Sequence, residues 1–75
     1  MRVEEIFANV FQLDVFEVDD SLSRERIQQW DSMAHLTLIT ELERAFRVSI
    51  SIADAIEVTS VGRAKDILKR YGASC

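Results

Sequence analysis

Residues 30–46, which read WDSMAHLTLITELERAF, decide the fold of this 75-residue chain. Asp31 or Ser32 supplies an N-cap for a helix. Apolar side chains follow at spacings of three and four, namely Met33, Leu36, Ile39, Leu42 and Phe46. Because this spacing puts them on one helix face, we expect that face to pack against the core. The other side is the polar one and carries Ala34, His35, Thr37, Glu41 and Arg44.

The chain before this helix contains one more helix and a long connection. Residues 2–13 have the same apolar period, carried by Val3, Ile6, Phe7, Val10 and Leu13. The pattern then disappears for about seventeen residues, from Asp14 to Trp30, which is longer than the usual connection between bundle helices. We expect this loop to be held against the core by its own apolar residues, which are Leu22, Ile27 and Trp30.

The chain after the central helix predicts two further helices. Residues 48–52 alternate as a strand would, but a single strand without a partner is not stable, so we expect an extended link that places Val48 and Ile50 under the core. Ser51, with Asp54 three residues later, predicts a cap for a short helix. Thr59 and Ser60 form the cap signal for a last helix. Its inward residues are Val61, Ala64, Ile67, Leu68 and Tyr71, and Gly72 ends it.

The predicted fold is therefore all-α, a small four-helix bundle in one domain over residues 1–75. It has three longer helices, a short third helix and a long loop between the first two. A composition of 48% hydrophobic and 29% charged residues is typical of a globular chain rather than a disordered one. A domain of this size has little room for an enclosed catalytic cavity, so we expect a protein that is not itself an enzyme.

Charge and cysteine content exclude several classes of partner. The sequence has no basic, aromatic-interleaved face for nucleic acid.

The sequence has no apolar run of ~18 residues for a membrane span and no secretory segment, so a cytoplasmic location is expected. The single Cys75 cannot form an internal disulfide, no zinc-binding cluster accompanies it, and we interpret it as a tail residue. No feature indicates an oligomer, and we expect a monomer.

Asp31-Ser32-Met33, at the start of the central helix, resembles the phosphopantetheine attachment motif of acyl carrier proteins. The surrounding sequence resembles the same family in register over nearly all 75 residues. The matching segments are Leu13-Asp14-Val15, Asp19-Asp20-Ser21-Leu22, Leu42-Glu43-Arg44-Ala45-Phe46, Ile50-Ser51-Ile52-Ala53-Asp54-Ala55 and Val58-Thr59-Ser60-Val61-Gly62.

The resemblance implies a covalent cofactor on Ser32. A phosphopantetheinyl transferase would move 4'-phosphopantetheine from coenzyme A to the hydroxyl, and the thiol of the arm would hold acyl groups as thioesters. Acyl-loading and acyl-transferring enzymes would be the other partners. A serine at the start of a helix suits this chemistry, because the helix dipole and the free N–H groups favour the phosphodiester anion. A serine beside an aspartate in this place is otherwise simply a helix cap.

The sequence also departs from the family. Carrier proteins of fatty acid synthesis typically have acidic residues in the second helix where this chain has Ala34, Thr37 and Arg44. Ile52 and Ile56 stand where polar or acidic residues are usual, either as partner contacts or as additional core. Because complementary charge selects partners, these changes favour dedicated enzymes of a specialised acyl, fatty acid or polyketide-like pathway.

Four further residues are candidates for the partner surface. Asp31 either helps to present Ser32 or only caps the helix. Met33 is either a partner contact or core filling. We interpret His35 as a surface residue that partners contact, and Glu41 as a solvated residue with partner docking as the alternative.

Other functions remain open at this point. Asp-Ser-Met also resembles the attachment motif of D-alanyl carriers, whereas peptidyl carriers more often have Gly-Gly where this chain has Gln28 and Gln29. A small helical interaction module without any prosthetic group is the alternative from a different class. A hydrolase built on Ser32 and His35 would also need an orienting acid and an oxyanion hole, for which the sequence has no signal.

Overall fold

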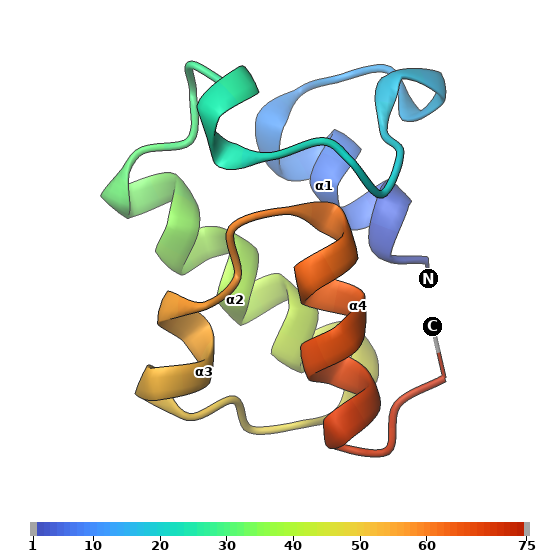
Figure 1. Cartoon of the computed structure of the whole chain (residues 1–75), viewed down its shortest axis with the longest axis vertical. Helices are drawn as coiled ribbons and strands as arrows, with labels where there is room; N and C mark the ends of the chain where they lie inside the picture. Colours follow the sequence, from blue (N-terminus) through green and yellow to red (C-terminus); the bar gives the residue numbers. More distant parts are fainter. Residues whose placement is uncertain (1, 75) are drawn as a thin grey trace.

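The computed structural model describes residues 2–74 and forms an all-α four-helix bundle across them (Figure 1). The helices are α1 (Val3–Phe11), α2 (Ser32–Phe46), α3 (Ile52–Ile56) and α4 (Val61–Arg70). Two short 3-10 turns, η1 (Val15–Glu17) and η2 (Arg24–Arg26), lie in the long connection between α1 and α2. The predicted fold class, the short third helix and the long loop are confirmed. Cys75 lies outside the described residues.

Helix α1 is shorter than the predicted span of residues 2–13. Gln12 adopts a left-handed conformation with φ of 56° and ends the helix, so that Leu13 belongs to the connection. The N–H of Leu13 bonds the carbonyl of Ala8 at 2.9 Å, which satisfies a carbonyl at the helix end. The apolar period therefore continued for two residues beyond the helix, because a half-buried connection also needs apolar side chains.

The predicted inward face of α2 is confirmed at Ile39, Leu42 and the partly buried Phe46, but it is wrong in the first turns of the helix. Leu38, Ile39 and Leu42 are buried, whereas Met33 and Leu36 are 79% and 68% exposed. The prediction that Met33 and Leu36 face the core is therefore wrong. Apolar residues occupy a wide arc of this helix, and spacing alone does not choose which part of the arc meets α1.

The long loop is held to the bundle by apolar residues, as predicted. Ile27 and Trp30 are buried, and Leu22 packs partly buried against the same core. Val18, which the sequence analysis did not identify, is a further buried anchor. Each buried apolar side chain contributes about 1.5–3 kcal/mol relative to exposure, which offsets part of the entropy lost in ordering the loop.

Backbone contacts also fasten the loop to the start of α4. The N–H of Val61 bonds the carbonyl of Leu22, and the N–H of Gly62 bonds that of Asp20, both at 3.0 Å. A Cβ at Gly62 would lie 3.1 Å from the Asp20 oxygen, so the absent side chain permits this close approach.

Lys65 joins three parts of the fold through ion pairs. Its Nζ donates to Asp20 Oδ1 in the loop at 2.6 Å and to Glu4 Oε2 on α1 at 2.7 Å. The carboxylates of Asp20 and Glu4 raise the pKa of Lys65, and the hydrogen bond from Lys65 lowers the pKa of Glu4. These contacts keep α1, the loop and α4 in register.

The caps of the last two helices follow the sequence signals. The Ser51 hydroxyl accepts from the N–H of Asp54 at 3.1 Å, and the Ser60 hydroxyl accepts from that of Arg63 at 3.0 Å. Gly72, at φ of 85°, follows the end of α4. No strand forms in residues 2–74, and the link before α3 buries Ile50 and half-buries Val48 as expected.

Candidate functional site

Ser32 is the first residue of α2 and is exposed. The cap is Asp31, whose Oδ1 accepts the N–H of Ala34 at 2.8 Å. The Ser32 hydroxyl therefore does not serve as the cap, and among residues 2–74 the structure shows no hydrogen bond to it. A hydroxyl at this place is accessible to a modifying enzyme.

Trp30, two residues before Ser32, anchors the start of α2. Its indole ring is buried between Phe7 and Phe11 of α1, with ring centroids 5.6 and 5.0 Å away. The prediction that Trp30 holds the loop on the bundle is confirmed. The backbone carbonyl of Trp30 accepts from Arg24 Nε at 3.3 Å, so η2 also contacts this junction.

His35 connects this junction to α3. The Trp30 indole N–H donates to His35 Nδ1 at 2.9 Å, and His35 Nε2 lies 2.8 Å from the carbonyl oxygen of Ala55. Because Nδ1 accepts, the proton of the neutral ring belongs on Nε2, which then donates to Ala55. His35 is therefore not a free surface side chain, and its contact with partner enzymes stays a prediction. It is half-buried, and both of its nitrogens are engaged away from Ser32.

No sequence signal marked this contact, because Trp30 lies before the helix and Ala55 lies twenty residues further along the chain. Only the placement of α3 beside α2 brings a backbone carbonyl to the second nitrogen of His35. The resulting bridge joins the long loop, α2 and α3 close to Ser32.

Polar contacts with the last residue of α4, Arg70, and with Tyr71 after it also hold α3. None of the residues Ile52–Ile56 is buried. The Tyr71 hydroxyl donates to Asp54 and accepts the N–H of Ser51 at 3.0 Å. Arg70 Nη1 adds an ion pair to Asp54 at 3.5 Å. The hydrogen bond from Tyr71 is the main cause that lowers the pKa of Asp54, with Ser51 and Arg70 acting in the same direction.

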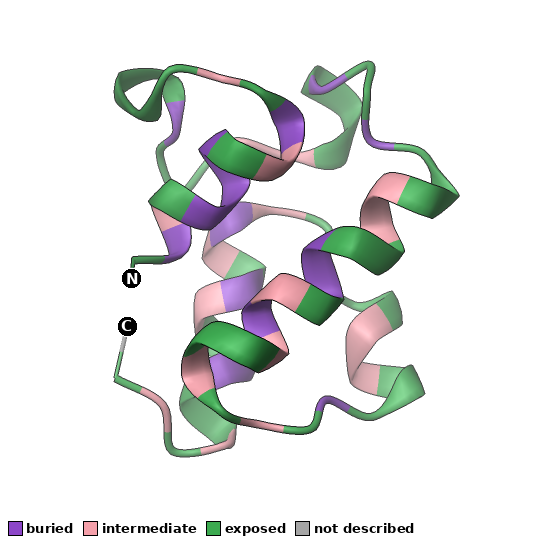
Figure 2. Cartoon of the chain, turned by 180° about the vertical axis from the view of Figure 1, so that it is seen from behind, coloured by how far each residue is buried: buried purple, intermediate pink, exposed green. Residues whose placement is uncertain are grey.

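Four large apolar side chains lie exposed on the two helices that His35 joins. Besides Met33 and Leu36 on α2, Ile52 is 82% and Ile56 70% exposed on α3. We call these four residues the apolar α2–α3 face. The alternatives that placed Met33, Ile52 and Ile56 in the core are therefore wrong. Figure 2 shows the exposed residues at the start of α2 and over α3, and buried ones in the middle of α2.

Leu36 is a member of this face that the sequence analysis assigned to the core. The spacing put Leu36 on the expected core face between Met33 and Ile39, whereas the fold buries Leu38, two positions later. Glu41, the remaining candidate partner residue, is half-exposed and pairs with Arg44 at 3.6 Å on the helix surface.

Other kinds of site are not seen in the described part of the chain. Residues 2–74 contain no group of three or more His, Cys, Asp or Glu placed to hold a metal ion. In the same residues no helix is long and apolar enough to cross a membrane.

The chain matches no model of a known protein family, and no curated protein matches it.

Proposed function

We propose that this chain is a carrier of the acyl carrier protein type, which receives 4'-phosphopantetheine on Ser32 and presents acyl thioesters to enzymes of a specialised acyl pathway. The observation that carries the proposal is that two neighbouring residues have separate roles at the start of α2. Asp31 caps the helix, and the exposed Ser32 hydroxyl remains available. The resemblance of Asp31-Ser32-Met33 and its surroundings to acyl carrier proteins supplies the chemistry.

The surroundings of Ser32 suit a phosphodiester. The first N–H groups of a helix have no intrahelical acceptors, and they carry the positive end of the helix dipole. An anion attached at the first residue of α2 would therefore be stabilised there. When bound, the arm supplies a terminal thiol that holds acyl groups as thioesters. The residues of this chain contribute position rather than catalysis, since both nitrogens of His35 are engaged with Trp30 and Ala55.

The apolar α2–α3 face is the surface on which enzymes would dock. It begins one residue after Ser32, so an enzyme that covers Met33 also has the modified serine within reach. Exposed apolar side chains of this size favour protein contacts. Because α2 has few acids near Ser32, binding would depend more on apolar burial than on charge, which supports dedicated partner enzymes.

The proposal is tested by the intact mass of the chain after incubation with coenzyme A, magnesium and a broad-specificity phosphopantetheinyl transferase. We expect the native chain to gain the mass of one phosphopantetheine and Ser32→Ala to gain none. Ser49→Ala is the matched control, because Ser49 is also exposed, and it should be modified like the native chain. A known carrier in the same tube reports that the transferase is active.

A folded native chain that gains no mass while the known carrier is modified would overturn the proposal. The second candidate is then a helical interaction module without a prosthetic group. The exposure of Met33, Leu36, Ile52 and Ile56 favours it, since a docking surface needs no modified serine.

A further inference from the structure

A second exposed apolar feature lies far from Ser32. Phe16, in the turn η1, is 94% exposed, which is more than any residue of the apolar α2–α3 face. Figure 1 shows η1 as the light-blue turn after α1, on the other side of the molecule from the start of α2. A phenylalanine displayed so fully has no role in the core, and an enzyme docked at Met33 would not cover it.

The turn that displays Phe16 is well ordered by its own hydrogen bonds. Asp14 Oδ1 accepts the N–H of Phe16 at 3.0 Å, and Glu17 Oε1 accepts the N–H of Asp14 at 3.1 Å. Val18, directly after the turn, is buried in the core. The backbone that carries Phe16 is therefore held in place, and its ring is presented to solvent, where a partner can cover it.

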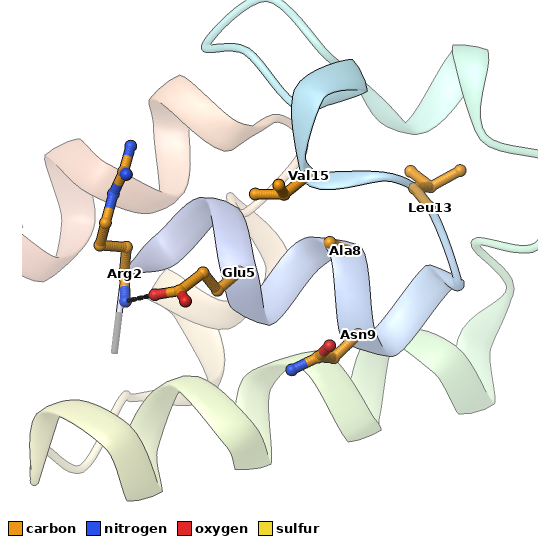
Figure 3. A pocket seen from close by; sticks show the side chains of 6 residues that line it. All are labelled: Arg2, Glu5, Ala8, Asn9, Leu13 and Val15. Carbon is orange, nitrogen blue, oxygen red and sulfur yellow. Dashed lines mark hydrogen bonds between the residues drawn. The ribbon is translucent and has the colours of Figure 1, made fainter.

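A hollow lies beside this turn. It has a volume of about 350 Å³ and lies between α1 and the chain that leads into η1 (Figure 3). Its lining residues are Arg2, Glu5, Ala8, Asn9, Leu13 and Val15. Val15 lines the hollow and directly precedes Phe16, so the exposed ring starts one residue from the rim of the hollow. We call the hollow and Phe16 together the η1 surface.

The charge around the η1 surface restricts its partner. Residues 13–20 contain four acids, Asp14, Glu17, Asp19 and Asp20, and no base. The lining of the hollow adds one more acid, Glu5, and one base, Arg2, which pairs with Glu4 at 3.7 Å. Lys65 pairs with Asp20, but Asp14 and Glu17, which flank Phe16, are exposed acids. Negative charge around an apolar centre repels nucleic acid and anionic lipid surfaces. It attracts a protein segment that carries lysine or arginine beside apolar side chains.

We propose that the η1 surface docks a basic amphipathic helix of a partner protein. An apolar side chain of that helix enters the hollow beside Val15, and Phe16 packs on its apolar face. Lysine or arginine side chains of the helix pair with Asp14 and Glu17, and an arginine also stacks on the ring. This inference does not depend on modification of Ser32, because its residues lie outside that site.

The probes are three synthetic peptides of about 18 residues, or five helical turns. The first is an amphipathic leucine–lysine–arginine helix, the second has glutamate in place of every basic residue, and the third has serine in place of every leucine. Each is titrated into the full chain at low salt, and amide chemical shifts are followed by NMR. We expect only the first peptide to bind, with shifts concentrated in residues 8–17.

Three variants of the chain locate the binding. Phe16→Ser should raise the Kd of the first peptide at least tenfold. Glu17→Gln, which removes the charge but keeps an oxygen for the Asp14 N–H, should weaken binding and reduce its dependence on salt. Ile56→Ser, a matched loss of an exposed apolar side chain on α3, should leave the Kd unchanged.

Binding that persists in Phe16→Ser, or shifts that map to the apolar α2–α3 face, would overturn the inference. If the glutamate peptide bound as tightly as the basic peptide, the acids around Phe16 would not select the partner, and the inference would be overturned. A dimer in sedimentation velocity that disappears in Phe16→Ser would show that a second copy of the chain covers the surface instead. None of these results changes the mass gained at Ser32, so the two proposals fail separately.

Discussion

Replacing His35 by alanine tests the bridge between the loop, α2 and α3. The substitution removes the acceptor for the Trp30 indole N–H and the donor for the Ala55 carbonyl. A buried group that loses its only partner costs about 1–3 kcal/mol. The indole N–H of Trp30 is buried and loses its acceptor, so its cost should be near the upper end, whereas the Ala55 carbonyl still accepts the N–H of Val58 at 3.2 Å and should add little.

The expected loss of stability is about 2–3 kcal/mol, mainly from the indole N–H left without its acceptor, and it is reduced by about 0.5 kcal/mol because alanine favours helix. A domain of this size loses about 4–8 °C in Tm for each kcal/mol, so the midpoint should fall by at least 6 °C or so. This is a large fraction of the few kcal/mol that stabilise a small domain.

The assay is thermal unfolding for Tm and urea unfolding for the free energy, each followed by circular dichroism and by tryptophan fluorescence. Trp30 is the single tryptophan of the chain, so its emission reports this junction directly. Arg44→Ala, on the exposed surface of α2, is the control and should change stability by no more than about 0.5 kcal/mol.

A double-mutant cycle with Trp30→Phe isolates the hydrogen bond, because phenylalanine keeps an aromatic ring but has no N–H. The coupling free energy should be about 0.5–3 kcal/mol. A change below about 0.5 kcal/mol for His35→Ala, or no coupling in the cycle, would refute the reasoning that His35 joins the two segments.

Three further predictions follow from the fold. Leu38→Ala should lower stability by about 2–5 kcal/mol, whereas Leu36→Ala should change it by less than about 0.5 kcal/mol; equal losses in chemical denaturation would contradict the observed face of α2. Asp31→Ala should cost about 1 kcal/mol through loss of the α2 cap, measured by thermal unfolding, and no loss would mean that Ser32 can cap in its place. Because Glu4 and Asp54 have pKa values below their ordinary 4.5 and 3.8, their contribution to stability is present above those values and is lost as the pH falls through the folded-state pKa. The urea midpoint should therefore decrease from about pH 5 to about pH 3, and a constant midpoint would contradict this.

Local signals were sufficient to predict most of the helices and their ends. Ser51 and Ser60 cap α3 and α4 because a serine hydroxyl reaches the N–H three residues later within one turn. Gly72 follows α4 because its left-handed conformation suits glycine. Ser32 could be singled out in the same way, since the motif around it is contiguous in sequence.

Contacts between distant segments were not predictable from these patterns. The sequence showed a polar histidine at position 35. Only the fold brings the Trp30 indole and the Ala55 carbonyl within hydrogen-bonding distance of its two ring nitrogens. The spacing placed Leu36 on the core face, although the fold buries Leu38 instead, and it left the burial of Ile52 and Ile56 open. Burial depends on which neighbour covers a side chain, and that neighbour lies on another helix.

The sequence by itself determined an all-α chain with a long loop, the caps of its helices and a serine at the start of the second helix. These features depend on residues within one or two turns of each other, where spacing and hydrogen-bonding side chains act directly. The tertiary structure decided which side of α2 is buried, how His35 is bonded and which apolar residues remain exposed on α2, α3 and η1. These depend on how whole helices pack, because only packing determines which apolar surface is removed from water.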